Sequence, residues 1–400
     1  MNIEISKSTK DAIELVRIIG KEYLRPLGLE ADRLKRPIPK DHPFYFMVAK
    51  SGYMTQGMGS EEPKTSKSSS HSEGSVRSVL VAEEGSYWDR GALVSLPGPG
   101  LGGPPLARMG TPEQKERFFA PFRQKERPVW AAFAMTEPGA GSDVARITTR
   151  AFKTKGGWVL KGQKMYSSNS PRAEWVVVFA TIDPDLKRAG HRAFIVEKNT
   201  PGFEILRIEH KMGLRAYETA TFSLDECFVP DENLLGGESY YESSQQKGFE
   251  GAMAAFNSTR PIIASMAVGI ARCAYDLAKD AYKDIAIQAF RRKETVLEKL
   301  VEMRATIESA RWACLKAAFM ADAHIPNAME ASIAKAYAPP KSLEVVETAC
   351  EILGEAGLLN DSIAEKLARD VKALDIVEGT QQIQRRVISK HLGLVLTSSE

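Results

Sequence analysis

The chain has 400 residues, with 54 Lys and Arg against 51 Asp and Glu, so its formal net charge is only +3. So small and evenly mixed a charge argues against a nucleic-acid-binding protein. The four Cys are widely spaced without a CxxC pair, which argues against a disulfide framework or a zinc site and favours a reducing compartment. No apolar run approaches the roughly 18–20 residues of a membrane span, and the first residues lack the pattern of a secretory signal. We therefore expect a cytoplasmic protein without a bound metal.

Residues 1–129 are predicted to form an N-terminal helical domain. Asp11–Tyr23 carries apolar side chains at helical spacing. Thr111 before Pro112 has the form of a helix start, with Thr as the N-cap and Pro at the first helical position. Gly59–Ser75 is rich in Ser and Lys, and it is too polar to bury apolar surface, so we expect a mobile surface loop. Ser95–Pro105 holds four Pro and four Gly and is not expected to form regular structure.

Residues 130–235 change to strand chemistry and are predicted to form a small antiparallel β-domain. Short runs rich in β-branched and aromatic residues alternate with turn clusters such as Gly156-Gly157 and Asn199–Gly202. The expected strands are Trp158–Leu160, Glu174–Ile182, Arg192–Glu197, Phe203–Ile208 and Thr219–Phe228.

Residues 236–400 return to helical periodicity and are predicted to form a C-terminal domain that resembles a four-helix bundle. One face of a long helix is marked by Leu300, Ile307, Cys314, Ala318 and Ala321. Further helices are expected at Ala331–Ala338, Ser342–Leu353, Ile363–Asp375 and Gln381–Leu394. The expected fold class is therefore α+β, with a helical domain, a β-domain and a helical bundle in chain order.

Ala134–Asp143 is the segment that points most directly to chemistry. It runs from a strand end into a glycine-rich turn and then a hydroxyl. Successive Gly residues let backbone N–H groups converge on an anion, and Ser142 adds a side-chain donor. This arrangement suits a nucleotide diphosphate. Taken alone, however, a Gly-Ser turn is more often a tight connection between strands.

Four motifs in this order resemble the acyl-CoA dehydrogenase family of flavoproteins. They are Met135–Asp143, Lys161–Asn169, Phe256–Pro261 and Ile376–Arg385. The resemblance covers most of the chain, from about Leu80 to His391, and the family subunit has the same order of helices, β-domain and helical bundle. It implies FAD-dependent oxidation of an acyl-CoA thioester to the 2-enoyl-CoA. It also implies an electron-transferring flavoprotein as acceptor and a dimeric or tetrameric homo- or hetero-oligomer.

The resemblance also assigns roles to individual residues. Glu378 corresponds to the base that removes the α-proton, at a position shielded from water where its pKa should rise. Taken alone, Glu378 is one of 51 acidic residues and would be interpreted as a solvated residue at a helix end. Arg260 corresponds to a residue that helps hold CoA. The other substrate positions are Ser142, Phe256 and Gly379.

The cofactor positions implied by the resemblance come from three of the four motifs. Met135 and Thr136 would bond the pyrimidine edge of the flavin, Tyr166 would lie against the flavin ring, and Ser168 would sit near its N5/O4 edge. The diphosphate would be held by Gly141 and Ser142. The full set is Met135, Thr136, Gly141, Ser142, Tyr166, Ser168, Thr380 and Gln382.

Two segments depart from the family pattern. The family usually has Arg-x-x-Phe-Gly where this chain has Lys283–Gln288, and Gln-Ile-Leu-Gly-Gly-x-Gly where it has Glu351–Gly357. Both serve the FAD of a neighbouring subunit, and two added carboxylates would repel a diphosphate. One alternative is therefore a subunit of a hetero-oligomeric dehydrogenase for bulky, for example steroid-like, acyl-CoAs. A second alternative is a flavin-poor partner subunit. A third is a flavin monooxygenase or oxidase on the same fold, although the presence of Glu378 argues against it.

Overall fold

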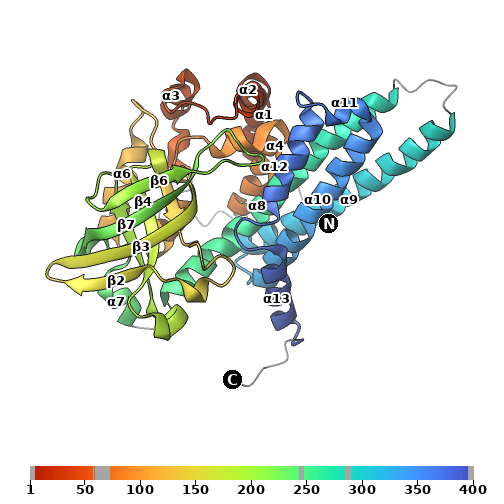
Figure 1. Cartoon of the computed structure of the whole chain (residues 1–400). Helices are drawn as coiled ribbons and strands as arrows, with labels where there is room; N and C mark the ends of the chain where they lie inside the picture. Colours follow the sequence, from red (N-terminus) through yellow and green to blue (C-terminus); the bar gives the residue numbers. More distant parts are fainter. Residues whose placement is uncertain (1–4, 57, 59–72, 243–246, 284–289, 395–400) are drawn as a thin grey trace.

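The computed structural model describes residues 5–56, 58, 73–242, 247–283 and 290–394. Helices from the first third of the chain, a sheet from the middle and long helices from the last third occupy three regions (Figure 1). This confirms the predicted α+β fold class and its order of elements. The Ser-rich stretch predicted to be a mobile loop falls mainly on residues 59–72, which lie outside the described residues.

The N-terminal helices largely follow the sequence pattern. The helix expected over Asp11–Tyr23 is present as α1 followed by one π-helical turn. Thr111 caps α6 as expected, because its hydroxyl accepts a hydrogen bond from Gln114 N–H at 3.2 Å and its own N–H donates to Gln114 Oε1 at 3.1 Å. The helices are α1 (Lys7–Ile19), α2 (Arg25–Arg33), α3 (Pro43–Lys50), α4 (Gly74–Val94), α5 (Gly103–Met109) and α6 (Pro112–Arg123).

Two predicted loops are shorter than expected. Gly74 and Ser75, which the sequence places in the Ser-rich loop, begin α4. Two N–H groups of this first turn donate to the Asp322 carboxylate at 2.8 and 3.0 Å, and this supplies the acceptors that the helix start needs. The prediction of irregular structure is also wrong for Pro104 and Pro105, which lie in the first turn of α5. Pro is tolerated there because N–H groups of a first turn have no helical acceptor.

Helix α4 is broken at Asp89, whose backbone is extended rather than helical, with φ −164° and ψ 112°. Asp89 Oδ1 accepts from Ala92 N–H at 2.8 Å and so caps the second part of the helix. Its other oxygen, Oδ2, accepts from Lys366 Nζ at 2.7 Å. The break bears on the candidate site described below, because Arg90 follows it directly.

The strands of the described residues form one seven-stranded sheet in the order β1-β4-β2-β3-β7-β6, with β5 paired to β4. Most pairings are antiparallel as predicted, whereas β1 runs parallel to β4 and one parallel bridge joins β2 to β4. All five predicted strands are present. Strand β1 ends at Ala134, where the sequence indicates a strand end, and β2 is additional. The strands are β1 (Ala131–Ala134), β2 (Arg150–Thr154), β3 (Gly157–Ser168), β4 (Trp175–Thr181), β5 (His191–Glu197), β6 (Phe203–Ile208) and β7 (Thr219–Pro230).

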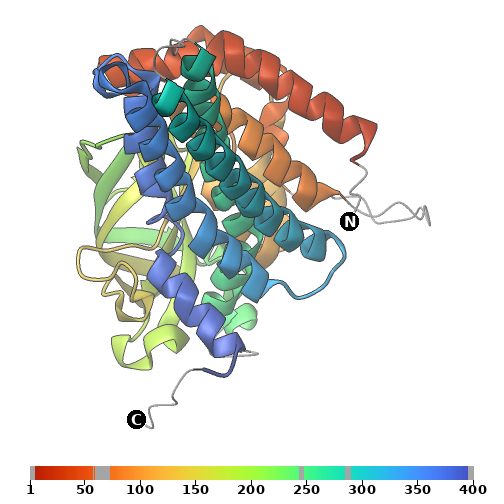
Figure 2. The same cartoon turned by 90° about the vertical axis from the view of Figure 1, so that its right-hand side faces the viewer.

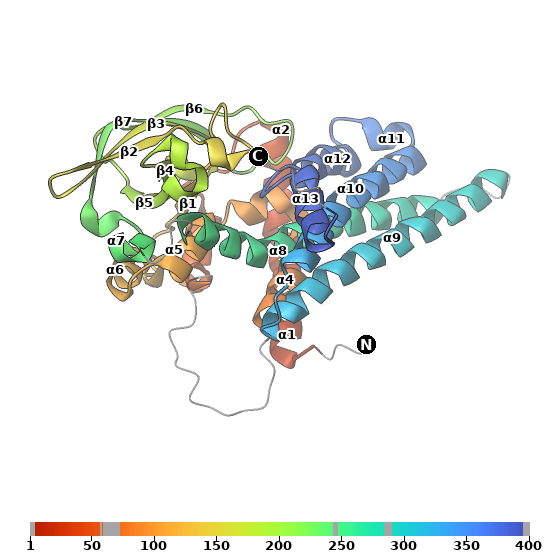
Figure 3. The ribbon, with the colours of Figure 1, turned by 90° about the horizontal axis from the view of Figure 1, so that it is seen from below.

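The last third of the chain packs as a helical bundle beside the sheet, and Figure 2 looks onto it. Helix α8 packs against α4, α9 and α10, and it also meets α5 and β5, so it links the bundle to the sheet (Figure 3). It begins at Lys247. The helices are α7 (Gly237–Glu242), α8 (Lys247–Lys283), α9 (Phe290–Asp322), α10 (Ala328–Leu353), α11 (Glu355–Leu358), α12 (Ile363–Leu374) and α13 (Gln381–His391).

Two helical predictions have different outcomes. The face predicted for α9 is confirmed at Leu300, Ile307, Cys314 and Ala318, all of which are buried in one cluster with α8 and α10. By contrast, the two helices expected on either side of residues 339–341 form the single helix α10, with Pro339 and Pro340 inside it.

One part of α8, Asn257–Lys283, is long and apolar enough to cross a membrane, which the sequence analysis does not anticipate. In the structure, 67% of its most apolar window is buried inside the protein. Ala264, Ala267, Val268 and Ile270 pack there against the other long helices. The apolar character of α8 therefore serves the core of the bundle.

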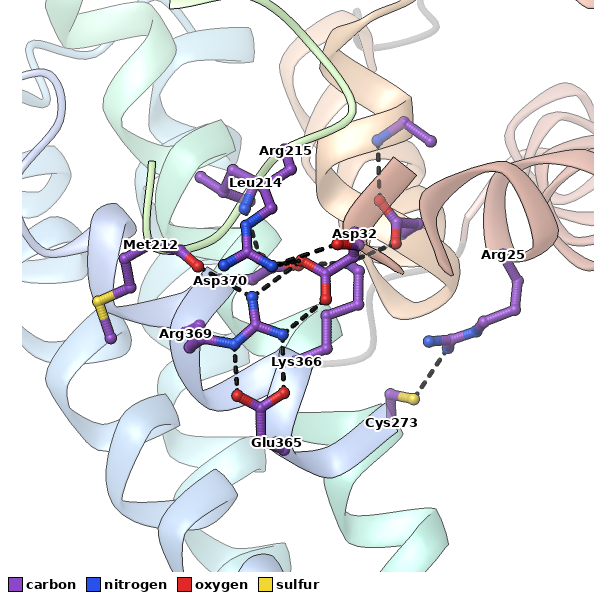
Figure 4. Close-up of polar contacts among 12 residues, drawn as sticks. Arg25, Asp32, Met212, Leu214, Arg215, Cys273, Glu365, Lys366, Arg369 and Asp370 are labelled. Carbon is purple, nitrogen blue, oxygen red and sulfur yellow. Dashed lines mark hydrogen bonds and ion pairs between the residues drawn. The ribbon is translucent and has the colours of Figure 1, made fainter. Parts of the chain in front are cut away.

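A network of ion pairs joins the three regions (Figure 4). Arg369 of α12 binds Asp32 of α2 at 2.6 Å and Glu365 at 2.5 Å. Its Nη1 also donates to the Met212 carbonyl at 2.9 Å, in the loop between β6 and β7. In the same loop, Leu214 N–H donates to Asp370 of α12 at 2.5 Å. These contacts hold the β6–β7 loop between the N-terminal helices and the bundle.

Candidate active site

Glu378 lies in the turn between α12 and α13, in a backbone conformation that few side chains adopt. Its φ is +55°, and Gly379 follows with φ +94°. A left-handed residue other than Gly costs on the order of 1 kcal/mol, so surrounding contacts must hold it. Gln384 supplies two of them, because its Nε2 donates to the carbonyl of Gly379 at 3.1 Å and to that of Glu378 at 3.4 Å.

The Glu378 carboxylate has one satisfied oxygen and one open oxygen. Thr259 Oγ1 of α8 donates to Oε2 at 2.6 Å. Oε1 is shielded from solvent and has no hydrogen-bond partner among the described residues. Burial raises the pKa of Glu378, while the Thr259 hydroxyl and the charges of Lys335, Arg260 and Arg90 act against that rise. A shielded carboxylate with a raised pKa and an open oxygen is what a general base requires.

Three buried cations from three helices surround this carboxylate. Arg90 belongs to α4, Arg260 to α8 and Lys335 to α10. Arg260 Nη1 donates to Asn257 Oδ1 at 2.7 Å, and its Nε has no partner among the described residues. Arg90 Nε is likewise buried without a partner in that part of the chain. Unpaired donors facing a buried carboxylate mark a place where a polar ligand can bind.

Arg90 also connects this cluster to the sheet. Its Nη1 donates to Tyr217 Oη at 2.9 Å, and Ser168 at the end of β3 lies within hydrogen-bonding reach of the same phenol. Burial alone would raise the pKa of Tyr217, but Arg90 and Lys211 outweigh it and lower that pKa. Arg90, whose charge acts on Glu378, is thus hydrogen-bonded to Tyr217, and Tyr217 lies within hydrogen-bonding reach of Ser168, a predicted cofactor residue.

Tyr166, the residue predicted to lie against the flavin, sits at an irregularity of β3. The pairing of β3 with β7 shifts register between Lys164 and Ser167, and Tyr166 has φ +56°. Such a bulge turns a side chain away from the regular alternation of the strand. Tyr166 is 60% exposed, which is high for a large aromatic side chain and leaves its ring free for a flat ligand.

The glycine-rich turn after β1 is open on its outer side. An added Cβ at Gly139 or Gly141 would meet no atom within 4 Å, and Ser142 is exposed. Thr136 is fixed to the sheet, because its carbonyl accepts from Met165 N–H at 2.9 Å. The turn therefore presents Gly and a hydroxyl outward from a fixed strand end, as an anion cradle requires.

A buried ion pair supports this turn from behind, and sequence reasoning missed it. Glu137 accepts from Thr148 N–H at 2.5 Å, Thr148 Oγ1 at 2.8 Å and Thr149 N–H at 3.0 Å. Lys164 Nζ binds the same carboxylate at 2.6 Å and the Met135 carbonyl at 3.0 Å. The sequence places Lys164 within the motif Lys161–Asn169 but gives no sign that it pairs with Glu137.

Among the described residues, the structure does not connect the remaining predicted site residues to the glycine-rich turn. Thr380 caps α13, with its hydroxyl accepting from Ile383 N–H at 3.4 Å, and Gln382 is exposed on that helix. Neither forms a hydrogen bond with the glycine-rich turn in the described part of the chain. Phe256 belongs to α8, but its side chain lies outside the described residues. Of the segment Lys283–Gln288, only Lys283 is described.

No group of three or more His, Cys, Asp or Glu within the described ranges could hold a metal ion. All four Cys are buried and free. The open groups described above are donors and one carboxylate, which is the chemistry of an organic ligand rather than a metal site.

Comparisons with known proteins agree with this geometry. Residues 132–227 match the family model "Acyl-CoA dehydrogenase, middle domain", and residues 246–393 match "Acyl-CoA dehydrogenase, C-terminal domain". An acyl-CoA dehydrogenase of Bacillus subtilis (strain 168) is 37% identical over 73% of this chain and 75% of its own length. The short-chain specific acyl-CoA dehydrogenase of rat mitochondria is 36% identical over 72% of this chain and 68% of its own.

Among solved structures, butyryl-CoA dehydrogenase from Megasphaera elsdenii superposes with a TM-score of 0.86 at 28% identity. The match covers 98% of this chain and 100% of that one. The fold and the matched domains define an FAD-dependent oxidoreductase that acts on CH–CH bonds. The chain belongs to the acyl-CoA dehydrogenase family.

The residues present fit FAD. Gly139 and Gly141 leave the outer side of the turn clear for phosphate oxygens, and Tyr166 presents an uncovered ring. Ser168 lies within hydrogen-bonding reach of Tyr217, which binds Arg90, one of the cations whose charge acts on Glu378.

Proposed function

We propose that the protein catalyses the α,β-dehydrogenation of an acyl-CoA thioester to the 2-enoyl-CoA, with Glu378 as the base. The observation that carries this proposal is the Glu378 carboxylate. It is held in a left-handed turn, shielded from solvent, and has one oxygen without a partner among the described residues. Family membership supplies the reaction class.

The chain's own residues account for the proton transfer. Oε1 of Glu378 takes the α-proton, while Thr259 keeps the other oxygen in place at 2.6 Å. Among the described residues the backbone N–H of Glu378 makes no hydrogen bond, so it is available to the thioester carbonyl. When bound, FAD supplies the hydride acceptor for the β-carbon. Arg260 offers its unpartnered Nε to the CoA portion of the substrate.

Three further properties are part of this proposal. An electron-transferring flavoprotein would accept the electrons, as the family resemblance implies. The enzyme would assemble as an oligomer, dimer or tetramer, in which a neighbouring chain completes the FAD site. Four buried, free thiols support a reducing, cytoplasmic location for its lipid or fatty-acid catabolism.

One observation bears on the hetero-oligomeric alternative. Both carboxylates added in Glu351–Gly357 are exposed, and Glu351 pairs with Lys299 of the same chain at 2.5 Å. The Glu351 charge is therefore engaged within the chain and repels a neighbour's diphosphate less than an unpaired carboxylate would. This weakens the charge argument for a subunit dedicated to bulky substrates, so we propose the ordinary dehydrogenase.

The test is the isosteric substitution Glu378→Gln in FAD-loaded protein. It should retain FAD and bind acyl-CoA, but it should lose anaerobic bleaching of the flavin by roughly 10³-fold or more, because an amide cannot accept the α-proton. Glu347→Gln, which changes an exposed carboxylate of α10, is the matched control. Full bleaching by Glu378→Gln would remove Glu378 as the base.

A further inference from the structure

Lys335 of α10 is a buried cation that the sequence analysis does not assign. It is 0% exposed, and it forms no ion pair with any described residue. The contacts of its ammonium are two carbonyl oxygens, that of Asp375 at 3.4 Å and that of Gly379 at 3.3 Å. Lys is almost never fully buried without a paired charge, so its presence requires an explanation.

Structural stability does not supply that explanation. Burial lowers the pKa of Lys335 to about 8, although Glu378 and Asp375 oppose the change. A lowered pKa means that the folded protein disfavours the charged form, so the ammonium weakens the fold at neutral pH.

The two carbonyls that Lys335 contacts lie on either side of Glu378. Gly379 O receives a second donor from Gln384 Nε2 at 3.1 Å. Lys335 and Gln384 thus hold the turn from two helices, α10 and α13, while Thr259 of α8 holds the carboxylate itself. An extra donor on the peptide next to a left-handed residue helps to keep that conformation.

We propose that Lys335 is a positioning residue for the base. It fixes the turn that carries Glu378, and its positive charge keeps the Glu378 carboxylate ionised before substrate binds. The inference rests on the proposed function of Glu378. It differs from that function because it concerns a group that touches neither substrate nor cofactor.

The charged groups that act on Glu378 come from three helices. Arg90 lies on α4, Arg260 on α8 and Lys335 on α10, while Asp375 of the turn acts on Lys335. The two Arg remain protonated at all working pH values. Lys335 is therefore the one cation of this set whose charge changes near neutral pH. Its effect on Glu378 is present below about pH 8 and fades as Lys335 loses its proton.

The test measures proton transfer without hydride transfer. 3,3-Dimethylbutyryl-CoA has α-hydrogens and no β-hydrogen, so the base can exchange its α-protons for deuterons in D₂O while FAD stays oxidised. In each cycle Glu378 takes one α-proton, the carbanionic thioester forms, and a deuteron returns to the same carbon. NMR follows the exchange across pH in FAD-loaded wild type, Lys335→Met, Lys335→Gln and Lys335→Arg. Lys341→Met, which removes an exposed Lys of the same helix, is the control.

We expect the acid limb of the exchange profile to move to higher pH by about one unit in Lys335→Met, a roughly tenfold loss at low pH. The limb moves to higher pH because loss of the Lys335 cation raises the pKa of Glu378. Lys335→Gln keeps a donor but loses the charge, so it should show the same shift with a smaller loss at high pH. Lys335→Arg should restore the wild-type limb, and Lys341→Met should match wild type.

Two outcomes would overturn the inference. One is an unshifted acid limb in both Lys335→Met and Lys335→Gln, and the other is an equal shift in Lys341→Met. A thermal melt separates the proposal from a purely structural role, because removal of an unpaired buried charge should leave the melting temperature unchanged or raise it. A different result would overturn the proposed function, and the inference with it. In that case the wild-type protein exchanges no α-protons, and no acyl-CoA bleaches its flavin.

Discussion

Removal of the buried cation behind the glycine-rich turn should destabilise the protein and weaken its hold on FAD. Lys164 is 0% exposed, and its ammonium bonds Glu137 at 2.6 Å and the Met135 carbonyl at 3.0 Å. Lys164→Met would leave the Glu137 carboxylate buried without its counter-charge. Breaking a buried pair in this way costs about 3–5 kcal/mol.

We expect the loss of stability in Lys164→Met to lie near the lower end of that range. Glu137 would keep three donors, two N–H groups and a hydroxyl from Thr148 and Thr149. These bonds stabilise the charge even without Lys164, so we expect a loss of about 3 kcal/mol in the free energy of unfolding. FAD content should fall as well, because Lys164 also anchors the strand end that leads into the turn.

The same strand provides a matched control. Lys161 of β3 pairs with Glu226 at 3.0 Å, but both side chains are more than half exposed. Lys161→Met should therefore change stability by less than about 1 kcal/mol. Urea unfolding followed by circular dichroism compares the two variants, and the absorbance of bound FAD gives the second measurement. Equal and small effects would refute the view that Lys164 and Glu137 support the cofactor turn.

The Glu137–Lys164 pair should also make the free energy of unfolding depend on pH. Burial would raise the pKa of Glu137, but Lys164 and the Thr donors outweigh it, so that pKa lies below its usual value of 4.5. A lowered folded-state pKa stabilises the protein above that value, and this contribution is lost as the pH falls through the folded-state pKa. Lys164→Met removes the cation that lowers this pKa, so Glu137 should contribute a smaller loss of stability on acidification than it does in wild type.

Two other substitutions test the cofactor cradle and the packing of the domains. Ser142→Leu should reduce FAD retention while leaving the melting temperature of the apoprotein within about a degree, because Ser142 is exposed. Unchanged FAD content would show that the phosphate assignment is wrong. Lys366→Met leaves two carboxylates, Asp89 and Asp370, in the interior without their cation, so the free energy of unfolding should fall by about 3–5 kcal/mol. Its control is Lys372→Met on the exposed side of α12, which should lower that free energy by less than about 1 kcal/mol. Similar urea midpoints for these two variants would contradict the account of the ion-pair network.

The parts of the fold that the sequence predicts are those with strong local patterns. Phe203–Ile208 has the β-branched and aromatic composition of a strand and forms β6 with those bounds. For strand β1 the sequence indicates only its end at Ala134, because three of its four residues are Ala, which have little strand propensity. Its pairing with β4 and its burial are tertiary effects that no local pattern records.

Helix α10 shows the opposite case, in which tertiary packing overrides a local stop signal. Pro339 and Pro340 lack the N–H groups that would bond the carbonyls of Lys335 and Ala336, so the sequence predicts a break. The helix continues because its two halves pack against α8, α9 and α13. One of the carbonyls freed in this way belongs to Lys335 itself.

The site is predictable only as far as its motifs extend. Glu378, Ser142 and Tyr166 lie in segments whose order along the chain resembles one family. Arg90, Tyr217 and Lys335 lie outside those motifs, on helices or loops far apart in sequence. Their approach to Glu378 depends on the break in α4 at Asp89 and on the crossing of α8 and α10. Neither feature follows from the spacing of residues.

The most direct test of the proposed function is an anaerobic titration of the FAD-loaded protein with saturated acyl-CoAs that differ in length and branching. Visible absorbance follows the flavin, and mass spectrometry follows the thioester. We expect at least one class of thioester to bleach the oxidised-flavin band in proportion to the appearance of a product lighter by two hydrogens. Flavin that a chemical reductant bleaches but that no acyl-CoA bleaches would contradict the assignment of this protein as an acyl-CoA dehydrogenase.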